Sequence, residues 1–145
     1  MAILVKRVPS LKIFELTIPF TKINGTHFPL VDVSFFTIYN DWFTVPLIFD
    51  TGAEDVVLKP DYEHVFPAGK VTSVGGIGGA GGHDAIETQS KVEFLGRQIS
   101  KCSILIDKVP APALIGGVAG RQIFKSFGFG FWENARELYV SLSPS

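Results

Sequence analysis

A chain of 145 residues, of which 46% are apolar, is long enough to bury one core, so we expect a single domain over residues 1–145. The net charge is −1 with acids and bases interspersed, which argues against nucleic acid or a polybasic membrane contact. The one cysteine, Cys102, excludes an intrachain disulfide and a multi-cysteine metal site, and we expect it to be a small buried side chain.

The first residues do not resemble a targeting segment. A very short apolar run precedes Lys6 and Arg7, which is the reverse of a secretory signal peptide. No apolar stretch approaches the length that crosses a membrane. We therefore expect a cytoplasmic protein with no membrane segment.

Strand signals dominate the remainder of the chain. Phe occupies 13 positions, β-branched residues are frequent, and glycine and proline separate the apolar runs. A loop is predicted over 59–70 and one short helix near 121–127. The predicted strands span residues 11–19, 28–38, 42–49, 56–58, 70–74, 85–90, 91–95, 98–106, 128–132 and 137–142. This order predicts an all-β chain.

The segment 47–58 contains the strongest candidate for a catalytic residue. An apolar strand delivers Asp50, and Thr51, Gly52 and Ala53 follow, so the carboxylate is expected at a tight turn where the strand ends. Two such carboxylates a few Å apart share one proton, and the pair can then act on water as acid and base. The chain holds a single Asp-Thr-Gly, so the second aspartate must come from a second copy. A homodimer with its active site on the two-fold axis is the prediction.

The segment from Asp50 to Leu58 resembles the active-site segment of the retropepsins, the single-domain aspartic proteases typified by retroviral proteases. Two other features fit the same family: the run 113–116 followed by the helix-like stretch 121–127, and the glycine-rich segment 75–82, where the family carries its flap. The three features cover a core of about residues 28–142. The resemblance implies a closed, mostly antiparallel, barrel-like retropepsin fold with a flap hairpin and one short C-terminal helix.

The resemblance also implies roles for individual residues. Asp50, Thr51 and Gly52 are the catalytic set, in which the Thr51 hydroxyl reaches across the dimer axis and Gly52 allows the two turns to approach. The substrate-binding residues that it implies are Ala53, Asp55, Gly76, Ile77, Gly78, Gly79 and Ile115. It implies no metal and no organic cofactor, because the attacking group is water.

The sequence departs from the family at one position. In retroviral enzymes the counterpart of Asp55 contacts the substrate backbone and pairs with an arginine that directly follows the Ile-Gly pair. Here a glycine follows instead, and the nearest arginine is Arg121, after an apparent insertion of residues 117–120. Arg121 either forms a salt bridge with Asp55 or is an unrelated surface charge. Glu54 is expected at the rim of the cleft, in solvent.

The segment 75–82 holds six glycines in eight residues and has two interpretations. A phosphate-binding loop needs a helix directly after the glycines, and residues 83–88 do not predict one. A mobile lid that donates backbone hydrogen bonds to a peptide is the better interpretation. His27, His64 and His83 lack partners at metal-ligand spacing, and we interpret them as loop residues.

These features together predict a homodimeric aspartic endopeptidase, in which the two Asp50 carboxylates activate a water molecule to hydrolyse a peptide bond. Its expected partners are a second copy of the chain and a protein or peptide substrate. A catalytically silent, dimeric peptide-binding module on the same fold is one alternative, because the expected arginine is missing. An unrelated β-barrel carrier of a small ligand is another, supported only by the Phe-rich composition.

Overall fold

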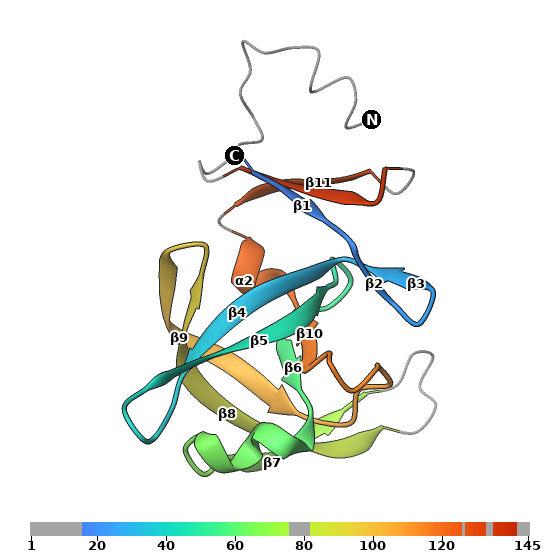
Figure 1. Cartoon of the computed structure of the whole chain (residues 1–145). Helices are drawn as coiled ribbons and strands as arrows, with labels where there is room; N and C mark the ends of the chain where they lie inside the picture. Colours follow the sequence, from blue (N-terminus) through green and yellow to red (C-terminus); the bar gives the residue numbers. More distant parts are fainter. Residues whose placement is uncertain (1–15, 76–81, 126, 133–134, 142–145) are drawn as a thin grey trace.

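The computed structural model describes residues 16–75, 82–125, 127–132 and 135–141, and it is mostly β (Figure 1). The all-β prediction is thereby confirmed. The described helices are a 3-10 helix, η1 (Pro60–Val65), and the short α2 (Arg121–Phe124). The described strands are β1 (Leu16–Pro19), β2 (Thr21–Ile23), β3 (Thr26–Phe28), β4 (Leu30–Phe36), β5 (Trp42–Phe49), β6 (Val56–Leu58), β7 (Lys70–Val74), β8 (His83–Phe94), β9 (Arg97–Ile106), β10 (Gly117–Ala119), β11 (Gly128–Trp132) and β12 (Glu137–Ser141).

The central feature is a ring of paired strands. The seven-stranded sheet has the order β4-β5-β10-β6-β9-β8-β7, and an additional pairing of β4 with β8 closes the ring, leaving β7 on its outside. The pairs β5–β10 and β6–β9 are parallel, and the other pairs of this sheet are antiparallel. The predicted mostly antiparallel arrangement is therefore confirmed.

Alternating side chains explain why these segments form strands around one core. In β4, Val31, Val33 and Phe35 are buried while Asp32 between them is exposed, the period of two that a strand with one buried face requires. The same alternation continues in β5 and β9. Central members of the core cluster are Val33, Phe35, Leu47, Val56, Leu58, Ile104 and Phe124.

Several turns carry their expected chemistry. The β8–β9 hairpin turns at Leu95 and Gly96, whose φ angles are 50° and 80°, and this hairpin was predicted. The β2–β3 hairpin turns at Asn24 and Gly25, with φ angles of 50° and 83°. This second hairpin was not predicted from the sequence, although Asn-Gly is the strongest short signal for such a turn.

Residues 117–120, described above as an apparent insertion, include a strand that was not predicted from the sequence. Residues 117–119 form β10, which lies between β5 and β6, with Gly117 opposite Leu47 on one side and Leu58 on the other. An ideal Cβ on Gly117 would lie 1.9 Å from the Val57 carbonyl oxygen, so only glycine fits there. A three-residue strand bounded by glycines has no periodicity by which the sequence could reveal it.

The strands predicted over 85–90 and 91–95 are one strand, β8, and the helix predicted near 121–127 is described as α2 over Arg121–Phe124. Two further differences have a local cause. Residues 59–70, predicted as a loop, contain η1, which has Pro60 in its first turn and acidic residues after it, a usual way for a helix to begin. The strand predicted over 28–38 is divided at Pro29, which has no N–H to donate to a strand ladder. Among the described residues, no helix is long and apolar enough to cross a membrane.

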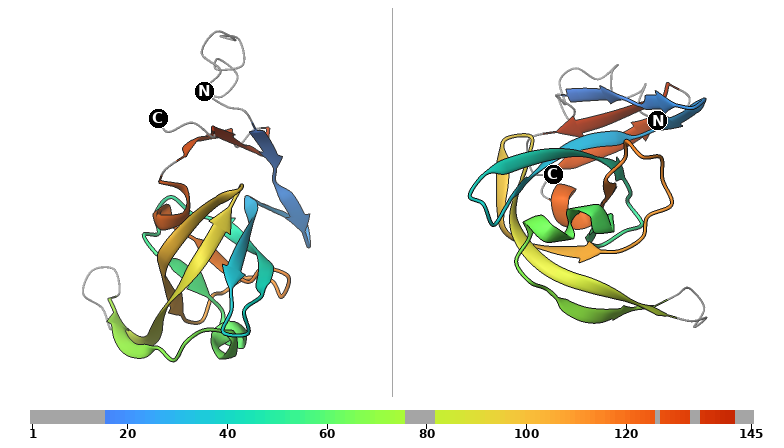
Figure 2. Two further views of the ribbon diagram at one scale, coloured as in Figure 1. Left: turned by 90° about the vertical axis from the view of Figure 1, so that its left-hand side faces the viewer. Right: turned by 60° about the horizontal axis from the view of Figure 1, so that its bottom comes forward.

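A second sheet of three strands, β1-β12-β11, lies at one end of the ring, with α2 beneath it (Figures 1 and 2). The predicted strand pair 128–132 and 137–142 corresponds to β11 and β12 as far as residue 141. The strand predicted over 11–19 is β1 from Leu16 onward, and residues 11–15 lie outside the described part of the chain. β1 is antiparallel to β12, with Leu16 opposite Val140, so the two ends of the described chain are neighbours.

Candidate active site

Asp50 lies at the turn between β5 and β6, as the sequence predicted. Its backbone N–H donates to the Ala119 carbonyl of β10 at 3.1 Å, which fixes the start of the turn. Its side chain is exposed, and Oδ1 accepts a hydrogen bond from the Gly52 N–H at 2.8 Å. An ideal Cβ on Gly52 would lie 3.3 Å from the same oxygen, a tight contact. The local backbone therefore orients this carboxylate.

The start of α2 holds the far side of the Asp50 turn. The Arg121 N–H donates to the Ala53 carbonyl at 2.9 Å, and the Gln122 N–H donates to the Glu54 carbonyl at 3.1 Å. An ideal Cβ on Gly120 would lie 2.3 Å from a backbone oxygen of the turn, so glycine is required for this approach. These bonds satisfy N–H groups that a helix leaves unpaired at its first turn.

Three aromatic rings anchor the strand that leads into Asp50. The ring of Phe49 stacks on that of Phe124 of α2, with 4.0 Å between centroids. Phe129 of β11 meets both rings edge-on at 5.2 Å. These contacts join the ring of strands, the helix and the second sheet at the residue that precedes Asp50. Their packing limits how far the turn can move.

Asp55 has an amide partner instead of the arginine of retroviral enzymes. Its Oδ1 accepts a hydrogen bond from Gln122 Nε2 at 2.5 Å, and Gln122 Oε1 in turn accepts from the Ser103 N–H at 3.0 Å. Burial raises the pKa of Asp55, the Gln122 hydrogen bond opposes this, and the charges of Glu54 and Glu87 add to the rise. Asp55 is thus a half-buried carboxylate whose charged form is disfavoured.

Arg121 pairs with a different acid from the one considered in the sequence analysis. Its Nη2 lies 2.6 Å from Glu54 Oε2, and both side chains are more than half exposed. Glu54 is in solvent, as expected. An exposed pair of this kind contributes little to stability, so the short helix depends on its backbone bonds and its aromatic contacts.

Cys102 is buried, as predicted, and belongs to the same hydrogen-bond network. Its thiol lies 3.5 Å from Gln122 Oε1, and burial raises its pKa to about 12. The nearby Asp55 charge acts in the same direction, while Lys125 opposes it. A thiol with this pKa is not a nucleophile at neutral pH.

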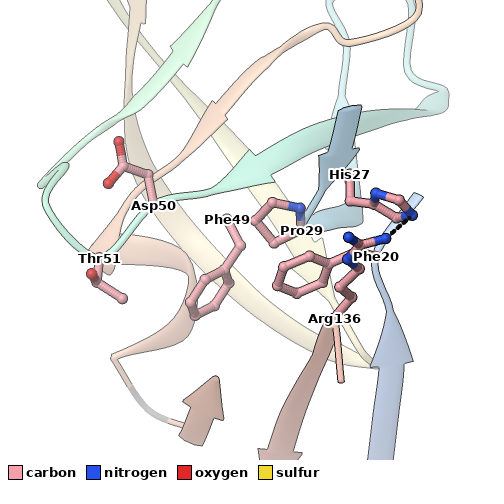
Figure 3. A pocket seen from close by; sticks show the side chains of 7 residues that line it. All are labelled: Phe20, His27, Pro29, Phe49, Asp50, Thr51 and Arg136. Atoms are coloured by element: carbon pink, nitrogen blue, oxygen red, sulfur yellow. Dashed lines mark hydrogen bonds between the residues drawn. The ribbon is translucent and has the colours of Figure 1, made fainter. Parts of the chain in front are cut away.

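An open pocket of about 510 Å³ begins at the Asp50 turn. Figure 3 shows Asp50 and Thr51 at one end, His27 and Arg136 at the other, and apolar side chains between them. The residues that line it are Phe20, His27, Pro29, Phe49, Asp50, Thr51 and Arg136. Its volume is within the range of small-molecule and side-chain sites, and it is acidic at one end and basic at the other.

The other predicted site residues differ in their exposure to solvent. Thr51 and Gly52 are exposed beside Asp50, and Ala53 is half-buried. The side chain of Ile115 is completely buried, whereas that of Leu114 before it is 71% exposed. The exposed apolar surface of this segment therefore belongs to Leu114.

The predicted flap falls largely outside the described residues. Gly76, Ile77, Gly78 and Gly79 all lie in the segment 76–81, of which the structure describes nothing. The strands on either side, β7 and β8, pair antiparallel as far as Val74 opposite His83. The stem of the predicted hairpin is therefore present.

Sequence reasoning missed three residues near this site: Gln122, His27 and Arg136. Gln122 and Asp55 are 67 positions apart, and Arg136 and His27 are 109 apart, so no local pattern connects them. His27 was interpreted as a loop residue, but it lies in β3.

Within the described ranges, no group of three or more His, Cys, Asp or Glu side chains is arranged to hold a metal ion. No protein-family model matches the chain, and no curated protein matches it.

Proposed function

We propose that the chain is a homodimeric aspartic endopeptidase of the retropepsin type. One observation carries the proposal: Asp50 is exposed at a turn that backbone bonds from β10 and Gly52 hold in place, at the edge of a pocket. A fixed, exposed carboxylate beside an apolar hollow is suited to work on a bound substrate. Because each chain carries one Asp-Thr-Gly, a second copy supplies the other acid.

The chemistry follows from two Asp50 carboxylates that share one proton. The ionised carboxylate takes a proton from water as the oxygen of that water attacks the scissile carbonyl carbon. The protonated carboxyl donates to the carbonyl oxygen, on which negative charge develops. The Gly52 N–H bond and the aromatic packing of Phe49 support this role, because they hold the acid before substrate arrives.

The substrate on this proposal is an extended peptide. β7 and β8 pair as the stem of the predicted flap hairpin, and the pocket at Asp50 offers apolar surface from Phe20, Pro29 and Phe49. A peptide bound as a strand places alternate side chains in pockets while its backbone is hydrogen-bonded.

Cleavage of an unstructured protein by the wild type and by Asp50→Asn tests the proposal. The variant changes charge with almost no change of shape, so we expect cleavage to fall at least about a thousandfold while the far-ultraviolet circular dichroism spectrum is unchanged. Asp32→Asn is the matched control, since Asp32 is exposed on β4, and it should retain full activity. An Asp50→Asn protein that still cleaves, when expressed in a protease-deficient host, would refute the dyad.

The silent peptide-binding module remains the second candidate, favoured by the amide partner of Asp55. It predicts peptide binding without cleavage by the wild type. The same experiment, with binding measured by fluorescence anisotropy of labelled peptides, separates the two candidates.

A further inference from the structure

The end of the pocket opposite Asp50 is basic. Arg136 Nη1 donates a hydrogen bond to His27 Nε2 at 2.9 Å (Figure 3). Lys22 of β2 lies opposite His27 of β3 in the strand ladder, so three nitrogen-bearing side chains are grouped at this end. Burial and the charges of Arg136 and Lys22 lower the pKa of His27. His27 is therefore neutral near pH 7, which is the form that accepts a hydrogen bond from an arginine.

No described carboxylate neutralises Arg136. The ion pairs among the described residues join Lys70 to Glu87, His83 to Asp107 and Arg121 to Glu54. A guanidinium has five N–H donors in a planar fork, and the contact with His27 engages one of its nitrogens. The other donors remain available to a ligand on the pocket side.

The backbone holds Arg136 in place at some cost. Its φ angle is 54°, in the left-handed region that arginine rarely adopts. Its carbonyl accepts a hydrogen bond from the Phe20 N–H at 2.8 Å, which ties this turn to the segment between β1 and β2. The Arg136 backbone is thus held by Phe20, and its guanidinium is held by His27.

We propose that Arg136, positioned by His27 and flanked by Lys22, binds the carboxylate of an acidic side chain in the peptide substrate. A carboxylate matches the arginine fork in a bidentate geometry, and the apolar surface of Phe49 and Pro29 accepts the methylene groups of that side chain. The inference rests on the proposed protease function and names its substrate class: peptides with Asp or Glu near the scissile bond.

The charges at the two ends of the pocket also restrict where the acidic residue lies. Asp50 repels a second carboxylate beside it, whereas Arg136 attracts one at the opposite end. The preferred acidic residue is therefore separated from the scissile bond by at least one residue.

The test compares peptide selection by matched variants in two measurements. A pool of random decapeptides is digested by the wild type, and the cut sites are read by mass spectrometry. In parallel, peptides retained on immobilised Asp50→Asn are sequenced in the same way. Arg136→Gln is introduced into both proteins, and Lys101→Gln, an exposed charge on β9, is the control.

We expect Asp and Glu to be enriched in the retained peptides and, in the digested ones, at a position on either side of the cut, because the two-fold axis supplies one Arg136 pocket from each subunit. Arg136→Gln should reduce that enrichment about tenfold, the effect of losing one charge-assisted hydrogen bond, whereas Lys101→Gln should leave the enrichment unchanged. His27→Gln retains an acceptor and should retain selectivity, whereas His27→Leu should lose it.

The outcomes separate this inference from the protease itself. Acid-enriched retention that depends on Arg136, together with no cleavage by the wild type, would support the site and refute the protease. No acid enrichment in either measurement, or an enrichment that survives Arg136→Gln, would overturn the site. A dimer weakened by Arg136→Gln, seen by sedimentation with peptide preference unchanged, would make the cluster a contact between subunits and equally overturn it.

Discussion

The surroundings of the Asp55 carboxylate disfavour its charged form. Its pKa is raised from 3.8, mainly by burial, so the native state binds the proton more readily than the unfolded chain does. Its contribution to stability is therefore present in full below pH 3.8 and is lost as the pH rises through the native pKa. A carboxylate placed where its charged form is disfavoured is a candidate for function.

Asp55→Asn tests this directly. The amide removes the charge and keeps an oxygen that can accept from Gln122 Nε2. We expect a variant at least as stable as the wild type at pH 7, with a smaller decline in stability between pH 4 and pH 7, measured by urea unfolding. Asp32→Asn is the exposed control. A variant less stable than the wild type by more than about 1 kcal/mol at pH 7 would contradict the raised pKa.

Cys102 makes a second prediction at the scale of one residue. With a pKa of about 12, its thiol is protonated at pH 8, and its side chain is buried. Iodoacetamide at pH 8 should label the native protein slowly, and labelling should accelerate as urea unfolds the chain. Because the native pKa is raised from 9.0, stability should also fall as the pH rises above 9. Fast labelling of fully folded protein would show that the thiol is accessible.

At the scale of elements, the contact between α2 and the Asp50 turn depends on Gly120. A methyl group there would lie 2.3 Å from the Asp55 carbonyl oxygen, so the helix would have to move away and lose its bonds to the turn. We expect Gly120→Ala to lower the free energy of unfolding by about 1–3 kcal/mol. We also expect it to reduce activity by more than the loss of folded protein explains, because the Asp50 turn is displaced. Gly75→Ala is the matched control for stability, because nothing lies within 4 Å of the added Cβ. If urea unfolding shows that the two variants are equally stable, the helix does not pack against the Asp50 turn as closely as described.

The elements that were predicted from sequence are those with local signals. β5, β7 and β11 have the bounds that their apolar runs and flanking turn residues indicated. β10 was missed because its three residues form a strand only between β5 and β6, which the sequence does not display. The same contrast holds at the site. Asp50 follows from a contiguous motif, whereas the partnership of Asp55 with Gln122 exists only after folding.

At the scale of the whole molecule, the proposed dimer makes activity depend on concentration. Half a dyad has no partner with which to share a proton, so specific activity should fall on dilution through the dimer dissociation constant. Thr51 is exposed beside Asp50 in the single chain and is expected to bridge the two copies. Thr51→Val should therefore raise the dissociation constant about tenfold or more, and Thr51→Ser, which keeps the hydroxyl, should not. Sedimentation measures the dissociation constant, and assays over the same dilution series measure the specific activity. Constant specific activity in a purely monomeric sample would rule out the shared site.

The position of β10 has a consequence for the order in which the protein is assembled. β5 and β6 are joined by the Asp50 turn, yet the strand that lies between them begins only at residue 117. Closing that long intervening segment has an entropic cost, so we expect the contacts of β10 with this turn to form late in folding. A nascent or prematurely terminated chain that ends after β9 contains Asp50 but has no β10 carbonyl to fix it and no α2 behind it. An incomplete translation product of this chain would therefore carry Asp50 without the backbone contacts that orient it.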